Sequence, residues 1–243
     1  MKLAAAQLRP VAGAVEKNIL KHRELIELAI ARSAEFVLFP ELSLTGYEPT
    51  LAKGLVLDLH AAWLDLFQDL SDAQGVAIGV GGPTSAPHDG VRISMFVIQP
   101  GRPRLIYSKQ HLHADELPFF VEGTGQLLIR WGDEVLAPAI CYESLQPGHA
   151  QQAARSGAHV YLASVAKSAA GLEKANSHYP RIAKQHSLTV LMANSIGTCD
   201  NFVAAGQSAA WGRDGEPLGR LDAEHEGIVV VDTNSGRACT YQL

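Results

Sequence analysis

Three apolar stretches of the sequence each end at a side chain that can take part in catalysis. Glu41 follows FVLFP, Lys109 follows LIYS, and Cys141 follows VLAPAI. Each stretch is short and apolar, as expected of a buried strand. Because ligands bind beyond the carboxyl ends of strands in open α/β sheets, we expect Glu41, Lys109 and Cys141 to meet at one edge of a sheet.

A glutamate, a lysine and a cysteine form a chemically complete set. A free thiol has a pKa near 8.5 and needs a base or a cation beside it to act as a nucleophile at neutral pH. Glu41 is the candidate base, because burial raises a carboxyl pKa toward a value at which the group both accepts and returns a proton. Lys109 is the candidate cation for the thiolate and for the oxyanion that follows attack on a carbonyl. The alternative for Cys141 is a purely structural role at a buried core position, which is common for cysteine.

The elements that must position these residues alternate between short apolar runs and longer runs of helical period, a pattern typical of an α/β chain. We predict helices at residues 15–32, 59–70, 147–156 and 173–187, and strands at 3–8, 36–39, 76–80, 135–140, 159–165, 188–194 and 227–232. Hairpins are expected around the turn letters QPGRP and around Asp214-Gly215. We assign Gly79, Gly81 and Gly82 to a turn, since no phosphate-binding motif surrounds them.

Three segments resemble the signature blocks of the nitrilase superfamily, the carbon–nitrogen hydrolases with a Glu-Lys-Cys triad. They are FPELSLTGYEP, SKQHL with a following glutamate, and AICYES. The order and spacing of the blocks also agree. The resemblance continues through GAHVYLASV, ANSIG and GQSAAWGRDGEPLG, and so covers nearly the whole chain. It implies an α/β fold of the four-layer α-β-β-α sandwich type, formed by a single domain over residues 1–243. It also implies a homodimer or a higher homo-oligomer.

The resemblance assigns a role to each residue of the site. Glu41 is expected to be the general base and acid, Lys109 the electrostatic stabiliser and Cys141 the nucleophile. Glu116, in the letters HADELPFF, is the candidate for the family's second glutamate, with Asp115 as a neighbouring alternative. The residue after the cysteine contributes its backbone N–H to the oxyanion in the family.

Tyr142 is the residue directly after the cysteine and so the candidate for this backbone N–H. By analogy with the family, the expected pocket residues are Tyr47, Phe119, Phe120, Glu143 and Ala166. The family commonly has a tryptophan soon after the strand that follows the cysteine, whereas this chain has only small residues and Lys167 there. We therefore expect a pocket of altered shape.

The predicted reaction is hydrolysis of a small amide through a thioester, without a metal or another cofactor. Nitrile hydrolysis and N-carbamoyl hydrolysis remain alternatives, because Glu143 stands where many amidases of the family have aspartate. An acyltransferase of the same superfamily and a catalytically silent binding protein with the same fold are further alternatives.

Composition narrows the classes of partner. With 47% hydrophobic and 19% charged residues the chain can bury a sizeable core, and a net charge of −5 provides no basic surface for nucleic acid. No stretch is long enough for a membrane span, and the first residues imitate a secretory signal poorly. Three widely spaced cysteines encode neither a disulfide framework nor a zinc site, so we expect a cytoplasmic protein in which Cys199 and Cys239 have no catalytic role.

The histidines are not expected to take part in catalysis. His113 and His149 are expected at exposed or loop positions, and a Cys/His dyad with His111 is disfavoured.

Overall fold

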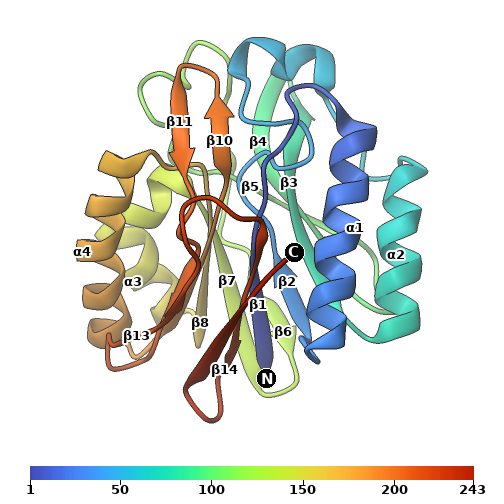
Figure 1. Ribbon diagram of the computed structural model, residues 1–243. Helices are drawn as coiled ribbons and strands as arrows, with labels where there is room; N and C mark the ends of the chain where they lie inside the picture. Colours follow the sequence, from blue (N-terminus) through green and yellow to red (C-terminus); the bar gives the residue numbers. More distant parts are fainter.

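Two β-sheets packed face to face, with helices on both outer sides, form the architecture of the protein (Figure 1). The computed structural model describes all of residues 1–243. The predicted fold class, an α-β-β-α sandwich, is confirmed. No helix combines the length and the apolar character that crossing a membrane requires.

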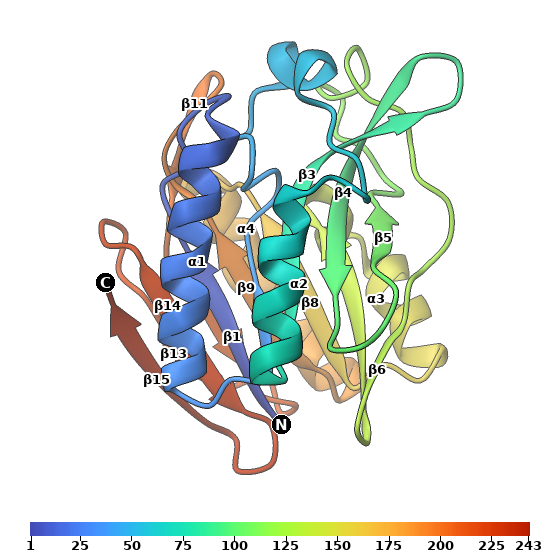
Figure 2. The ribbon, with the colours of Figure 1, turned by 90° about the vertical axis from the view of Figure 1, so that its right-hand side faces the viewer.

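The first sheet has seven strands and is covered by two helices from the first third of the chain (Figure 2). Its strands, in spatial order, are β15 (Arg237–Gln242), β14 (Gly227–Asp232), β1 (Lys2–Gln7), β2 (Phe36–Leu38), β3 (Ala77–Ala86), β4 (Gly90–Ile98) and β5 (Leu105–Ser108). Its helices are α1 (Val15–Ala31) and α2 (Trp63–Gln74), and the 3₁₀ helix η1 (Pro49–Leu55) lies between them in the chain.

The second sheet has six strands and is covered by α3 and α4. Its strands, in spatial order, are β13 (Pro217–Arg220), β12 (Ala209–Trp211), β9 (Thr189–Asn194), β8 (Val160–Val165), β7 (Glu134–Ile140) and β6 (Ile129–Trp131). The remaining elements are α3 (Pro147–Arg155), α4 (Ala169–His186), the 3₁₀ helix η2 (Cys141–Leu145) and the hairpin of β10 (Ile196–Cys199) with β11 (Phe202–Ala205).

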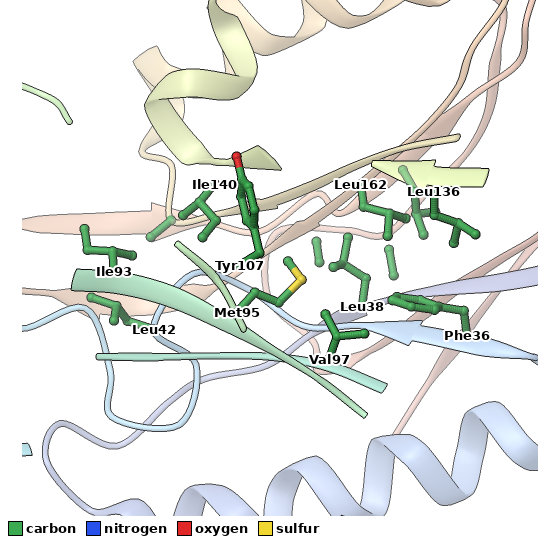
Figure 3. Close-up of a cluster of buried hydrophobic side chains, with 14 of the residues drawn as sticks. Phe36, Leu38, Leu42, Ile93, Met95, Val97, Tyr107, Leu136, Ile140 and Leu162 are labelled. Atoms are coloured by element: carbon green, nitrogen blue, oxygen red, sulfur yellow. The ribbon is translucent and has the colours of Figure 1, made fainter. Parts of the chain in front are cut away.

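The layers are held together by three clusters of buried apolar side chains. A cluster of 29 residues fills the space between the two sheets, including Leu38, Met95 and Leu162 (Figure 3). A second cluster of 21 residues packs the first sheet against its helices, and a third of 18 residues does the same for the second sheet. Because both faces of the central strands are covered, β2, β8 and β9 are buried at every position, which explains their continuous apolar letters.

The directions of the strands place the site at one edge of the sandwich. β1, β2 and β3 run parallel in the first sheet, and β7, β8 and β9 run parallel in the second. β5 pairs antiparallel with β4, which is itself antiparallel to β3, so β5 ends at the same edge as β2. The residues after β2, β5, β7 and β8 are thereby gathered between the sheets.

Several predicted elements differ from the structure. The helix predicted at 173–187 begins earlier, at Ala169, because Ser168 caps it by accepting a hydrogen bond from Gly171 N. The strand at 227–232 does not close the chain, since β15 pairs antiparallel with it. The assignment of Gly79, Gly81 and Gly82 to a turn was wrong: all three lie within β3.

Candidate active site

Glu41 is held in the turn after β2 by contacts from both sheets. Ser164 on β8 donates a hydrogen bond to Phe39 O over 2.8 Å, which ties the end of β2 to the opposite sheet. On the other side the turn lies against β3, where a Cβ atom at Gly81 would stand 2.5 Å from Pro40 O. Gly81 is therefore required for close approach of the two backbones, and Glu41 is left with 1% exposure.

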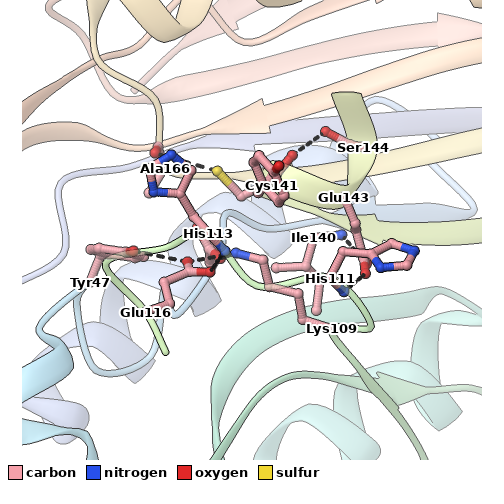
Figure 4. Close-up of polar contacts among 12 residues, drawn as sticks. Tyr47, Lys109, His111, His113, Glu116, Ile140, Cys141, Glu143, Ser144 and Ala166 are labelled. Carbon is pink, nitrogen blue, oxygen red and sulfur yellow. Dashed lines mark hydrogen bonds and ion pairs between the residues drawn. The ribbon is translucent and has the colours of Figure 1, made fainter. Parts of the chain in front are cut away.

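Lys109 lies between two carboxylates at the end of β5 (Figure 4). Its Nζ donates to Glu41 Oε1 over 2.7 Å and to Glu116 Oε1 over 2.6 Å, and all three side chains are buried. Glu116 also accepts hydrogen bonds from the Tyr47 hydroxyl and from His113 N. Since an ammonium group has three donors, one Lys109 N–H remains for another acceptor.

Cys141 begins η2 directly after β7, at a sharp change of backbone direction. Its φ is +46°, in the left-handed region that is sparsely populated by residues other than glycine. Strain of this kind persists where the surroundings enforce it and is frequent at active sites. The turn presents the sulfur beside Ala166 O and Lys167 Nζ, at 3.7 and 3.8 Å. The first backbone N–H groups of η2, including that of Tyr142, have no partner within the helix.

The charges of the buried cluster divide the roles of its members. Burial raises the pKa of Glu41 to about 7, against the opposing effect of the Lys109 charge. Burial also disfavours the charged form of Lys109, but the negative charges of Glu41 and Glu116 outweigh it and raise the pKa of the ammonium group. Glu41 Oε2 has no hydrogen-bond partner in the protein, so one buried carboxylate oxygen is free to accept a proton.

The thiol is protonated at rest and needs such a base. Burial and the Glu41 charge together raise the pKa of Cys141 to about 11, against the opposing effect of the Lys167 and Lys109 charges. A base whose pKa lies near 7 is well matched to take a proton during attack and to return it afterwards.

A cavity of about 370 Å³ opens onto the sulfur. Its lining includes Tyr47, Glu116, Tyr142, Ala166 and Lys167, together with Phe202 from the β10–β11 hairpin. Glu41 and Lys109 lie behind this lining, fully buried. The structure therefore brings Glu41, Lys109, Glu116 and Cys141 together at the inner end of a space that a small molecule can enter.

Three residues predicted to line the pocket do not reach it. The Phe119 side chain is exposed on the outside of the turn that follows Glu116, whereas Phe120 points into the core between the sheets. Glu143 is fully buried behind the cysteine, because its carboxylate is drawn to backbone N–H groups on two segments. The expectation for these three residues is corrected accordingly.

Glu143 has a structural function that the sequence did not indicate. Its Oε1 accepts hydrogen bonds from Ile140 N and the Tyr107 hydroxyl, both over 2.7 Å. Its Oε2 accepts from Gln110 N over 2.6 Å and from His111 N over 3.3 Å. One carboxylate thus fastens the segment after Lys109 to the strand end before Cys141.

Other residues near the site also differ from expectation. His149 is buried on α3 between the hydroxyls of Tyr107 and Tyr161, because those tyrosines provide partners for both ring nitrogens. His113 is exposed and lies in a loop, as expected, and it also lines the cavity. Lys167 lines the cavity too, a position that the sequence does not indicate. No motif reveals these positions, since they depend on which loops the two sheets bring together.

Comparison with known proteins agrees with this geometry. The chain matches the carbon-nitrogen hydrolase family over residues 2–241, and it belongs to that family. It is a hydrolase of the nitrilase superfamily that acts on carbon–nitrogen bonds. The resemblance read from the three signature blocks is thereby confirmed.

Relatives and solved structures of two kinds are similar to the chain. It is 28% identical to the glutamine-dependent NAD(+) synthetase of Rhodobacter capsulatus over 98% of this chain and 44% of that protein. The chain therefore spans less than half the length of this relative. The NitN amidase of Nesterenkonia sp. AN1 has the same fold, with a TM-score of 0.87 at 24% identity over 96% of this chain and 92% of that one. A glutamine-dependent NAD+ synthetase of Acinetobacter baumannii also shares the fold, with a TM-score of 0.84 at 20% identity over 100% and 47% of the two chains.

Proposed function

We propose that this protein hydrolyses the carbon–nitrogen bond of a small amide through a thioester on Cys141. The observation that carries the proposal is the free Glu41 Oε2 in a buried cluster with Lys109 and Glu116, next to a strained cysteine that opens onto a cavity. A base, a fixed cation and a nucleophile at one end of a cavity are the parts that acyl transfer requires.

In the first half of the reaction, Glu41 Oε2 takes the proton of the Cys141 thiol while the sulfur forms a bond to the amide carbonyl carbon. The oxyanion accepts hydrogen bonds from the third N–H of Lys109 and from the backbone N–H of Tyr142. The carbon–nitrogen bond then breaks, Glu41 gives its proton to the nitrogen, and ammonia or an amine leaves. A thioester remains on Cys141.

In the second half, a water molecule takes the place of the departed amine. Glu41 removes one proton from the water as its oxygen attacks the thioester carbon. The carbon–sulfur bond breaks, Glu41 returns the proton to the sulfur, and the carboxylic acid leaves. Glu116 keeps Lys109 charged and in place throughout, because it shares that ammonium with Glu41.

The test combines product formation with covalent labelling of the nucleophile. We expect wild-type protein to release ammonia from butyramide, an amide that a cysteine-to-alanine variant of the Nesterenkonia amidase binds. Cys141→Ala abolishes the release, whereas the matched variant Cys239→Ala, at an exposed position, leaves it unchanged. Equal release by wild type and Cys141→Ala would refute the proposal. Propionitrile and N-carbamoyl-β-alanine in the same panel distinguish the nitrilase and carbamoyl alternatives.

Trapping identifies the nucleophile without turnover. Fluoroacetamide leaves an acetamide group on the active-site cysteine of glutamate variants of the Nesterenkonia amidase. We expect Glu41→Gln of the present protein to retain the same group on Cys141, as seen by intact mass and peptide mapping. Modification of Cys199 or Cys239 instead would contradict the assignment.

Glutamine is a second candidate substrate. The relative from Rhodobacter capsulatus named above is a glutamine-dependent synthetase, and the similarity covers nearly all of this chain. L-Glutamine therefore belongs in the panel, with glutamate as the measured product. A rate for glutamine that exceeds the rate for butyramide would favour this candidate.

A further inference from the structure

Lys167 places a second buried cation at the nucleophile, outside the cluster of Glu41, Lys109 and Glu116. The residue follows β8, lines the cavity and has 5% exposure. The Cys141 sulfur, at 3.8 Å, is the one hydrogen-bond partner of its Nζ. Because an ammonium group has three donors, most of the hydrogen-bonding capacity of this buried cation is unused.

The position of Lys167 is set by its main chain. Asn194 Oδ1 accepts from Lys167 N over 2.8 Å, and Asn194 Nδ2 donates to Lys167 O over 3.2 Å. Ala205 N donates to the same carbonyl over 2.9 Å. The main chain of Lys167 is therefore anchored from β9 and from the β10–β11 hairpin, so its side chain starts from a fixed point at the cavity.

The N-terminus of α4 adds positive potential to the same cavity. This helix has 18 residues, and its N-cap Ser168, together with Gly171 and Lys174, lines the space beside Lys167. The first N–H groups of a helix carry partial positive charge and bind anions. Lys174 is exposed and forms no ion pair with a carboxylate, so it contributes a second free positive charge.

Each acidic group of the cavity has a hydrogen-bond partner of its own. Glu116 is paired with Lys109 and accepts from the Tyr47 hydroxyl. Asp115 Oδ1 lies within hydrogen-bond distance of the His113 ring, which forms an ion pair only when that ring is protonated. Lys167 and Lys174 are therefore the cationic groups of the cavity that have no carboxylate partner.

We infer that the cavity selects amides that carry a carboxylate a few bonds from the scissile carbonyl, and that Lys167 binds this carboxylate. The inference rests on the proposed function, because it specifies the substrate class of the same site.

The distances at the sulfur agree with such a substrate. A carbonyl carbon in position for attack lies about 3–3.5 Å from the sulfur, and a charged N–H···O bond spans about 2.7–2.9 Å. With Nζ 3.8 Å from Sγ, a carboxylate on Lys167 is close to the reacting carbon. Monoamides of short dicarboxylic acids fit this spacing.

Matched pairs of substrates test the inference. Succinamate and butyramide have the same number of carbon atoms, as do glutaramate and valeramide, and in each pair one member has a carboxylate where the other has a methyl group. We expect the wild type to prefer a charged member, and Lys167→Met to lower that preference roughly 10- to 100-fold, mainly through KM, because a charged hydrogen bond is lost. Lys167→Arg retains part of the preference, and Lys184→Met, an exposed lysine on α4, leaves it unchanged.

Binding to the inactive protein separates this inference from the proposed function. Calorimetry with Cys141→Ala is expected to show binding of succinamate or glutaramate that is lost in Cys141→Ala/Lys167→Met. If neither amide is hydrolysed but this binding is seen, the proposed reaction fails and the anion site stands. If butyramide and succinamate are hydrolysed at the same rate, or if Lys167→Met slows both equally, the proposed reaction stands and the anion site is refuted. Lys167 then acts on the sulfur instead.

Discussion

Replacing Glu143 by glutamine separates a role in positioning the catalytic segments from a role in contacting substrate. The carboxylate accepts four hydrogen bonds, two on each oxygen. In the glutamine variant one oxygen becomes an NH₂ group, which then faces a backbone N–H whichever way the amide is turned. At least two hydrogen bonds to a charged acceptor are lost, each worth about 1.5–3 kcal/mol.

The loss is partly offset, because burial of the carboxylate is itself unfavourable and raises the pKa of Glu143. We therefore expect Glu143→Gln to lower the free energy of unfolding by about 3 kcal/mol. Since the residue joins the Lys109 segment to the Cys141 turn, we also expect kcat to fall about 100-fold with little change in KM.

Urea unfolding and steady-state kinetics with butyramide measure both effects. Glu173→Gln, at an exposed position on α4, is the matched control and should change the free energy of unfolding by less than about 0.5 kcal/mol. A Glu143→Gln protein of unchanged stability whose KM alone rises would refute this reasoning, because it would place Glu143 in contact with substrate.

Three further predictions concern the same cluster. Gly81→Ala should displace the turn that carries Glu41, which lowers kcat and lowers the free energy of unfolding by about 1–3 kcal/mol. Gly54→Ala, whose Cβ meets nothing within 4 Å, is the control. Equal stability of the two variants would contradict the close approach at Gly81. With a pKa raised to about 7, Glu41 is protonated below that pH and cannot accept the thiol proton, so kcat/KM should rise with pH through about 7; a profile already flat from pH 5 would exclude this base. Tyr47→Phe removes one hydrogen bond to Glu116 and should cost about 1 kcal/mol of unfolding free energy in thermal melts, and a variant as stable as wild type would show that the bond contributes nothing.

Much of the fold could be predicted because its signals are local. The helical period of residues 15–32 and the apolar letters of 36–39 and 159–165 correspond to α1, β2 and β8. The hairpin around QPGRP appears as β4 and β5. The last strand, β15, was missed because it is largely exposed and its letters alternate weakly.

The chemical identity of the site was also present in the sequence. Glu41, Lys109 and Cys141 each follow an apolar strand, and a strand that stops at a reactive side chain can be read without knowing its neighbours. The roles of Gly81, Glu143 and Lys167 could not be read in this way. Each of them depends on a residue from another segment, and the packing of two sheets determines which segments meet.

The amino-acid sequence by itself determined which groups are available for catalysis and at which strand ends they stand, because strand and helix periods are properties of neighbouring residues. The tertiary structure alone decided that one carboxylate oxygen of Glu41 is free, that Glu143 faces inward and that Lys167 faces the cavity. These features arise from burial and from contacts between distant segments, and both are set when the two sheets close on each other.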